Sequence, residues 1–89
     1  MKVKLTQDIA IRDSVSTKYR QAGYVKYTQL SALAKKKCHR LSGNKAKLKK
    51  GNVVKVKNAT TAWYGSIWIQ IKNGWLPAVV SGKYRVQAV

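Results

Sequence analysis

The sequence predicts a small, mainly β domain that carries one inserted helix. In residues 67–71 isoleucine occupies every second position, which is typical of a β-strand with one buried face. Asn73-Gly74 follows this segment, and both residues favour the tight type I′ turn of a β-hairpin. Turn-forming residues recur roughly every 8–12 residues, the spacing of a small antiparallel barrel or sandwich.

The chain begins with strand-like segments. Val3-Lys4-Leu5 alternates between apolar and polar residues and predicts a short first strand. Residues 9–12 predict a second strand, which leads into the polar turn of residues 13–18.

A helix is predicted next, because the period of the apolar residues changes. Leu30, Leu33, Ala34, Cys38 and Leu41 fall on helical spacing, so we expect a helix from about Gln29 to Leu41. Thr28 is suited to be its N-cap and Gly43 its C-cap.

The second half of the chain returns to strands and turns. Trp75-Leu76 restarts an apolar run, and Pro77 predicts that this run is not a central strand. The other expected elements are a strand edge and turn at 45–52, a strand at 53–57, a loop at 58–62, the main strand at 63–72 with a break expected at Gly65-Ser66, a turn at Ser81-Gly82 and a last strand at 83–88.

The charge of the chain is its strongest functional signal. Nineteen lysine and arginine residues face two acids, Asp8 and Asp13, which gives a net charge of +17. So many positive side chains repel one another, which favours binding to a polyanionic partner. The candidates are nucleic acid, anionic lipid and an anionic wall polymer such as teichoic acid. The alternative is that the lysines serve solubility alone.

Composition limits the architecture and the location. The 89 residues predict one domain, with an apolar content of 45% that is ordinary for a folded chain. Cys38 is the only cysteine, so no internal disulfide can form. No apolar run is long enough for a membrane span, and no secretory signal is visible. Met1-Lys2 resembles an incidental start, so the chain is interpreted as a fragment.

The sequence predicts no catalytic or metal site, and no cofactor. Paired-carboxylate chemistry needs an acid in an apolar pocket, whereas Asp13 lies in a polar turn. Cys38 and His39 are neighbours, and on a helix they would point about 100° apart, too far for a nucleophile and its base. One cysteine and one histidine cannot complete a metal site.

Three sequence blocks resemble bacterial SH3 (SH3b) domains. They are residues 10–19, which read AIRDSVSTKY, residues 48–56, which read LKKGNVVKV, and residues 68–76, which read WIQIKNGWL. The blocks follow the family order and together span most of the chain. The chain departs from the family at Ser14-Val15, at Gln70, and in about twenty-five residues from Ala22 to Ala46 that replace a short connection. This insertion is similar to versions at the C-termini of cell-wall hydrolases from clostridia and their phages.

The resemblance implies a small SH3-like antiparallel barrel that binds the bacterial cell wall without catalysis. The expected partners are peptidoglycan or teichoic acid of a Gram-positive wall, together with an attached hydrolase domain in the same chain. Residues 1–89 would form a single binding domain of that larger hydrolase. The implied location is the bacterial wall, the extracellular space, or a phage lysin released at lysis.

The predicted ligand-binding residues are aromatic and basic. Tyr19, Trp63 and Tyr64 are expected to stack on a glycan or wall peptide. Trp68 alternates with the core isoleucines Ile67, Ile69 and Ile71, so it either faces the ligand or lies beneath the inserted helix. The cations expected to attract wall carboxylates or phosphates are Arg12, Lys55, Lys57 and Lys72.

Two other functions remain open from the sequence. A small basic β-barrel that binds nucleic acid would explain the charge and the aromatic residues equally well. A structural adaptor within a larger enzyme would leave the charge without a direct role.

Overall fold

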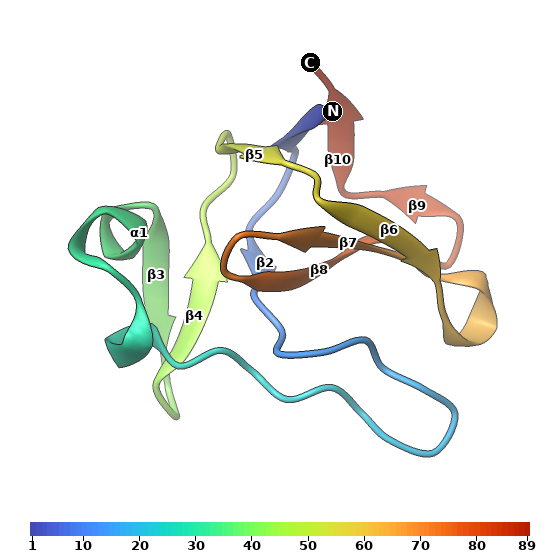
Figure 1. The fold of residues 1–89 in the computed structure, drawn as a ribbon, viewed down its shortest axis with the longest axis horizontal. Helices are drawn as coiled ribbons and strands as arrows, with labels where there is room; N and C mark the ends of the chain where they lie inside the picture. The colour runs from blue at the N-terminus through green and yellow to red at the C-terminus, as the bar shows by residue number, and fades with distance from the viewer.

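The computed structural model describes residues 1–89, which form three antiparallel sheets and one short α-helix (Figure 1). The first sheet has the order β10-β1-β5, from Val86–Ala88, Lys2–Leu5 and Val53–Lys55. The second has the order β2-β4-β3, from Ile9–Ala10, Lys45–Leu48 and Cys38–Leu41. The third has the order β6-β7-β8-β9, from Asn58–Thr61, Ile67–Ile71, Gly74–Val80 and Lys83–Tyr84. The mainly β fold with a single helix is therefore confirmed.

One stretch of chain joins the first sheet to the third and makes the fold barrel-like. The backbone N–H of Val56, just after β5, donates to the carbonyl of Met1 at 2.9 Å. The N–H of the next residue, Lys57, donates in the other direction, to the carbonyl of Gln70 in β7 at 2.8 Å. The chain thus leaves β1 and continues beside β7 as β6, as Figure 1 shows. The segment 58–62, predicted as a loop, is mostly this edge strand.

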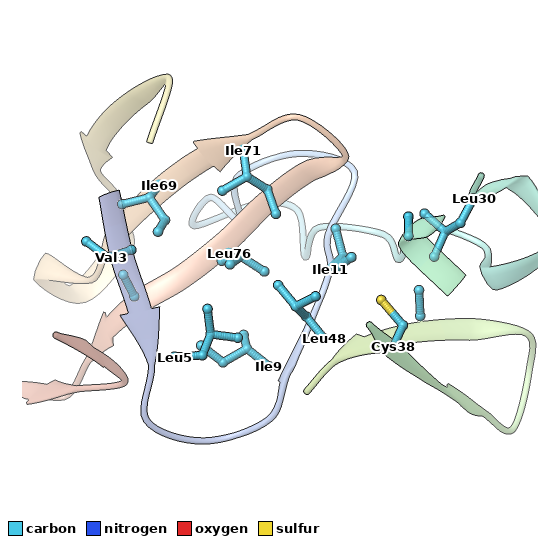
Figure 2. Close-up of a cluster of buried hydrophobic side chains, with 13 residues drawn as sticks. Val3, Leu5, Ile9, Ile11, Leu30, Cys38, Leu48, Ile69, Ile71 and Leu76 are labelled. Atoms are coloured by element: carbon cyan, nitrogen blue, oxygen red, sulfur yellow. The ribbon is translucent and has the colours of Figure 1, made fainter. Parts of the chain in front are cut away.

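The core lies where the three sheets meet. Leu5, Ile9, Ile11 and Leu76 are the largest fully buried side chains, and they point toward a common centre in Figure 2. The buried cluster also includes Cys38, one of the residues on the predicted helical spacing. The alternation of apolar residues along β1 and β7 thus supplies much of this core.

Burial at Cys38 leads to a prediction about its chemistry. Desolvation raises the pKa of the Cys38 thiol, and the positive charge of Lys49 offsets part of that rise. We expect the native thiol to react with a disulfide reagent about tenfold or more slowly than the urea-unfolded thiol at pH 8, since attack requires the thiolate and access. Equal rates in the two states would contradict this.

The raised pKa also sets the sign of a pH effect. The unfolded thiol ionises first as the pH rises, so this contribution to stability is fully present below about pH 8.5 and declines above it. The difference in free energy of unfolding between the parent and Cys38→Ala should therefore shrink from pH 7 to pH 10 in urea titrations.

The predicted helix from Gln29 to Leu41 was too long. The α-helix α1 is Ala32–Lys36, and it follows the short 3₁₀-helix η1 at Tyr27–Gln29. Its N-cap is Ser31, not Thr28, because the Ser31 hydroxyl accepts a hydrogen bond from the N–H of Ala34 at 3.2 Å. Neither the five-residue α1 nor the two short 3₁₀-helices could span a lipid bilayer.

The predicted end of that helix is instead a β-hairpin. β3 pairs with β4 in register from Cys38 opposite Leu48 to Leu41 opposite Lys45. Gly43 and Asn44 have φ values of +80° and +60° and turn the chain between these strands, so Gly43 does not cap a helix. Pairing with β4 therefore overrides the helical spacing of the apolar residues.

The type I′ turn predicted at Asn73-Gly74 was misplaced. Ile71 pairs with Gly74, so Lys72 and Asn73 form the turn of the β7–β8 hairpin, and only Gly74 has a positive φ, +145°. Positive φ at two successive turn residues occurs at the predicted turn Ser81-Gly82, with values of +52° and +75°.

Two strands differ from their predicted extent. β8 continues through Pro77 although it has neighbours on both sides. The proline is tolerated because β9 pairs only with Val79 and Val80, and a register shift lies opposite, between Ile67 and Trp68. The single last strand expected at residues 83–88 is divided into β9 and β10, which belong to different sheets.

Candidate functional site: an aromatic surface

A tight turn between β6 and β7 presents two aromatic rings to solvent. This turn is the 3₁₀-helix η2 at Trp63–Gly65, in which Trp63 is 46% exposed and Tyr64 is 84% exposed. The two ring centroids lie 4.3 Å apart with their planes tilted by 33°. Tyr64 has a φ of +60°, a conformation that is unfavourable for a bulky residue and that often marks a functional site.

Trp68 supports this turn from below. The indole Nε1–H of Trp68 donates to the Ser66 hydroxyl at 3.1 Å, and that hydroxyl donates to the carbonyl of Trp63 at 2.9 Å. Trp68 is only 5% exposed but does not belong to the core cluster that contains Ile69 and Ile71. It therefore lies on the opposite face of β7 and fixes the turn that carries the exposed rings.

The helix is not what buries Trp68. α1 packs beside β3 at the far side of the molecule from the η2 end of β7 (Figure 1). The guanidinium of Arg12 instead lies 5.8 Å from the centre of the Trp68 ring, and Ser16 lines the same hollow as Trp68. Ile67, predicted to be in the core, is 36% exposed; it is the first residue of β7, and a register shift separates its pairing from that of Trp68.

Arg12 holds the base of the polar loop that follows β2. Its Nε donates to the carbonyl of Gly23 at 3.1 Å, its Nη2 donates to the carbonyl of Ala22, and its guanidinium lies 4.1 Å from the ring centre of Tyr24. These contacts use two of the guanidinium nitrogens and one face of its plane. The structure thus gives the predicted ligand-binding Arg12 a role in shaping the loop.

The same loop presents Tyr19. The Thr17 hydroxyl oxygen accepts hydrogen bonds from the N–H groups of Tyr19, at 3.3 Å, and Arg20, at 3.1 Å, which closes a small turn. The Ser16 hydroxyl accepts from the N–H of Ala22 at 2.9 Å. Tyr19 is 90% exposed at the tip of this turn.

Trp63 joins the two presented segments into one site, here called the aromatic surface: Tyr19, Trp63 and Tyr64. Trp63 and Tyr19 line a hollow of about 390 Å³, whose other lining residues are polar or basic, among them Thr17, Lys18 and Gln21. Trp63 and Tyr64 line a second hollow of about 200 Å³ together with Trp68. Exposed rings beside hydroxyl, amide and cationic groups can stack on flat or sugar-like rings and hydrogen-bond to them.

The predicted lysines lie elsewhere. Lys55, Lys57 and Lys72 line a separate groove that shares no residue with the two aromatic hollows. Lys72 follows the end of β7 that lies about 14 Å from the η2 end, at ~3.4 Å per residue along the strand. The structure therefore divides the predicted site residues between two surfaces.

Several residues of these surfaces were missed by the sequence analysis. Ser16 and Ser66 were part of polar turns with no distinguishing pattern, and Lys37 was one of three consecutive lysines. Their roles depend on contacts between segments distant in sequence, which no local spacing reveals.

Asp8, Asp13, Cys38 and His39 line neither aromatic hollow. His39 Nε2 lies 3.7 Å from Asp8 Oδ2, and both side chains are exposed. Cys38 and His39 are neighbours on strand β3, so their side chains point to opposite faces of the strand and not about 100° apart as on the predicted helix. The structure contains no cluster of three or more metal-ligating side chains.

Comparison with protein-family models, with curated proteins and with solved structures gives no match to this chain.

Proposed function

We propose that this chain is a non-catalytic module that binds the Gram-positive cell wall and targets an attached peptidoglycan hydrolase to it. The observation that carries the proposal is the aromatic surface, on which three exposed rings from two segments border two hollows, one polar and one mainly apolar. Rings held by hydrogen-bonded turns bind a sugar or peptide at a low entropic cost. The module would act at the bacterial wall, in the extracellular space, or in a phage lysin released at lysis.

The SH3b-like sequence blocks support the same proposal. Residues 10–19 include Tyr19, and residues 68–76 begin at Trp68, which supports the turn of Trp63 and Tyr64. Two of the three blocks thus border the aromatic surface. The net charge of +17 would draw the module toward peptidoglycan carboxylates and teichoic phosphates.

Nucleic acid is the second candidate ligand, because exposed aromatic rings beside cations also suit the stacking of single-stranded bases. The two candidates differ in the expected competition. A wall-binding module should keep its wall affinity in the presence of excess nucleic acid, whereas a nucleic-acid-binding protein should be removed from walls by it.

Sedimentation with purified Gram-positive walls tests the proposal. The 89-residue domain should co-sediment with walls and release no soluble sugar or peptide. Tyr64→Ala should weaken binding about tenfold, because a stacked ring contributes about 1–3 kcal/mol. Tyr84→Ala is the matched control, since Tyr84 is 72% exposed but lines neither aromatic hollow, and it should bind like the parent.

The same sedimentation measurement is repeated at different salt concentrations and with walls that lack teichoic acid. Wall binding should weaken between 0.1 M and 1 M salt, as the screening length falls from ~10 Å to ~3 Å. Walls stripped of teichoic acid should bind more weakly if phosphates contribute. Lytic activity of the pure domain, or tighter binding to single-stranded or duplex nucleic acid than to walls at equal salt, would overturn the proposal.

A further inference from the structure

A second surface lies at the other end of β7 from the aromatic surface. It is a groove of about 480 Å³ between the turn of the β7–β8 hairpin, strand β5 and the end of α1. Its floor is apolar and includes Cys38, Leu48 and Ile71, each of which is at most 6% exposed. Its rim carries four exposed lysines: Lys37, Lys55, Lys57 and Lys72.

The protein itself does not neutralise this rim. No acidic residue lines the groove, and the only ion pair in the structure joins His39 to Asp8. Four ammonium groups around an apolar floor therefore form an unmatched positive site. The matching ligand carries negative groups at its edges and apolar groups between them.

Strand β5 adds a third property to the groove, an open sheet edge. β5 is the last strand of its sheet and pairs only with β1. In an antiparallel pair, the backbone groups of successive residues point alternately toward and away from the partner strand. The carbonyl of Asn52 accepts a hydrogen bond from the N–H of Leu5, and the N–H of Val56 donates to the carbonyl of Met1, each at 2.9 Å. Asn52 and Val56 therefore face β1. The backbone groups of Val53 and Lys55 consequently point away from β1, on the side where the groove lies.

We propose that this groove docks an extended polypeptide segment in which acidic side chains alternate with apolar ones, added to β5 as an extra strand. The backbone of such a segment pairs with the free edge at Val53 and Lys55, its apolar side chains cover the floor, and its carboxylates meet the lysines. A phosphate polymer or a nucleic acid supplies charge but no backbone N–H and C=O ladder. The proposal is independent of the wall-binding function, because the two surfaces share no residue.

Calorimetric titration of the 89-residue chain tests the charge requirement. The probe is a capped nine-residue peptide in which glutamate alternates with valine, and the comparison peptide has glutamine in place of each glutamate. Lys57→Gln with Lys72→Gln should weaken binding of the acidic peptide about tenfold, since two partly exposed ion pairs are lost. The matched control, Lys26→Gln with Lys83→Gln, removes the same charge from exposed lysines outside the groove and should change affinity less than twofold.

Amide hydrogen exchange tests the added strand. The N–H groups of Val53 and Lys55 should become protected on addition of the acidic peptide, and a peptide N-methylated at every second residue should not protect them. Equal loss of affinity in both lysine pairs, or unchanged exchange at Val53 and Lys55, would overturn the proposal. So would tighter lysine-dependent binding of poly(glycerol phosphate) than of a peptide with equal charge.

Discussion

Replacing Trp68 with alanine is expected to lower the free energy of unfolding by about 3–5 kcal/mol, the usual cost of removing a large buried aromatic side chain. Trp68 is 5% exposed, and its indole N–H supports the Ser66 hydroxyl beneath η2. Wall binding should fall as well, because the turn that presents Trp63 and Tyr64 loses its anchor. Urea denaturation and wall sedimentation of the same samples measure both effects.

Two further variants distinguish the packing role of Trp68 from its role in holding the turn that exposes Trp63 and Tyr64. Trp68→Phe keeps most of the ring volume but removes the donor to Ser66, so it should cost only about 1–2 kcal/mol and loosen the turn. Tyr64→Ala should melt close to the parent, because Tyr64 is 84% exposed, and should lose wall affinity alone. A Trp68→Ala protein with the stability of the parent would show that this face of β7 is not packed.

Gly74→Ala is expected to be the second severe change, with a loss of about 2–6 kcal/mol. An added methyl group would lie 2.5 Å from the carbonyl oxygen of Arg12 and 3.0 Å from Cγ2 of Ile11. The φ of +145° at Gly74 is also one that side chains rarely adopt. Backbone strain contributes ~1–3 kcal/mol and steric overlap a similar amount.

The clash at Gly74 would occur at a junction of the fold. Arg12 and Trp75 exchange two backbone hydrogen bonds of 2.8 Å, which attach the segment after β2 to β8. Arg12 is also the residue that anchors the loop of Tyr19. Gly74→Ala should therefore reduce wall binding in whatever fraction remains folded.

Gly82→Ala is the control for backbone strain alone. Gly82 has a φ of +75°, but nothing lies within 4 Å of an added methyl group. Gly82→Ala should lower the free energy of unfolding by about 1 kcal/mol, because a residue with a Cβ atom is strained at a positive φ. Equal melting temperatures for the two glycine variants would contradict the close approach of Gly74 to Arg12.

The elements that were predicted well are those whose signal is local and strong. Alternation at Val3-Lys4-Leu5 and along residues 67–71 predicted strands β1 and β7, and Ser81-Gly82 predicted a turn. In contrast, the apolar spacing from Leu30 to Leu41 fits a helix, yet its second half pairs with β4. The spacing of apolar residues over a dozen positions does not show whether the backbone hydrogen bonds form within a helix or with a partner strand.

The candidate site divides in the same way. The sequence by itself determined the mainly β class, the net charge of +17 and the choice of Tyr19, Trp63 and Tyr64 as exposed aromatic candidates. Only the tertiary structure decided that Trp63 shares one hollow with Tyr19 and another with Tyr64, that Trp68 supports the turn of Trp63 and Tyr64, and that the lysines line a separate groove. The physical reason is that residue type and period depend on neighbours along the chain, whereas a shared surface depends on which strands pair and on the register in which they pair.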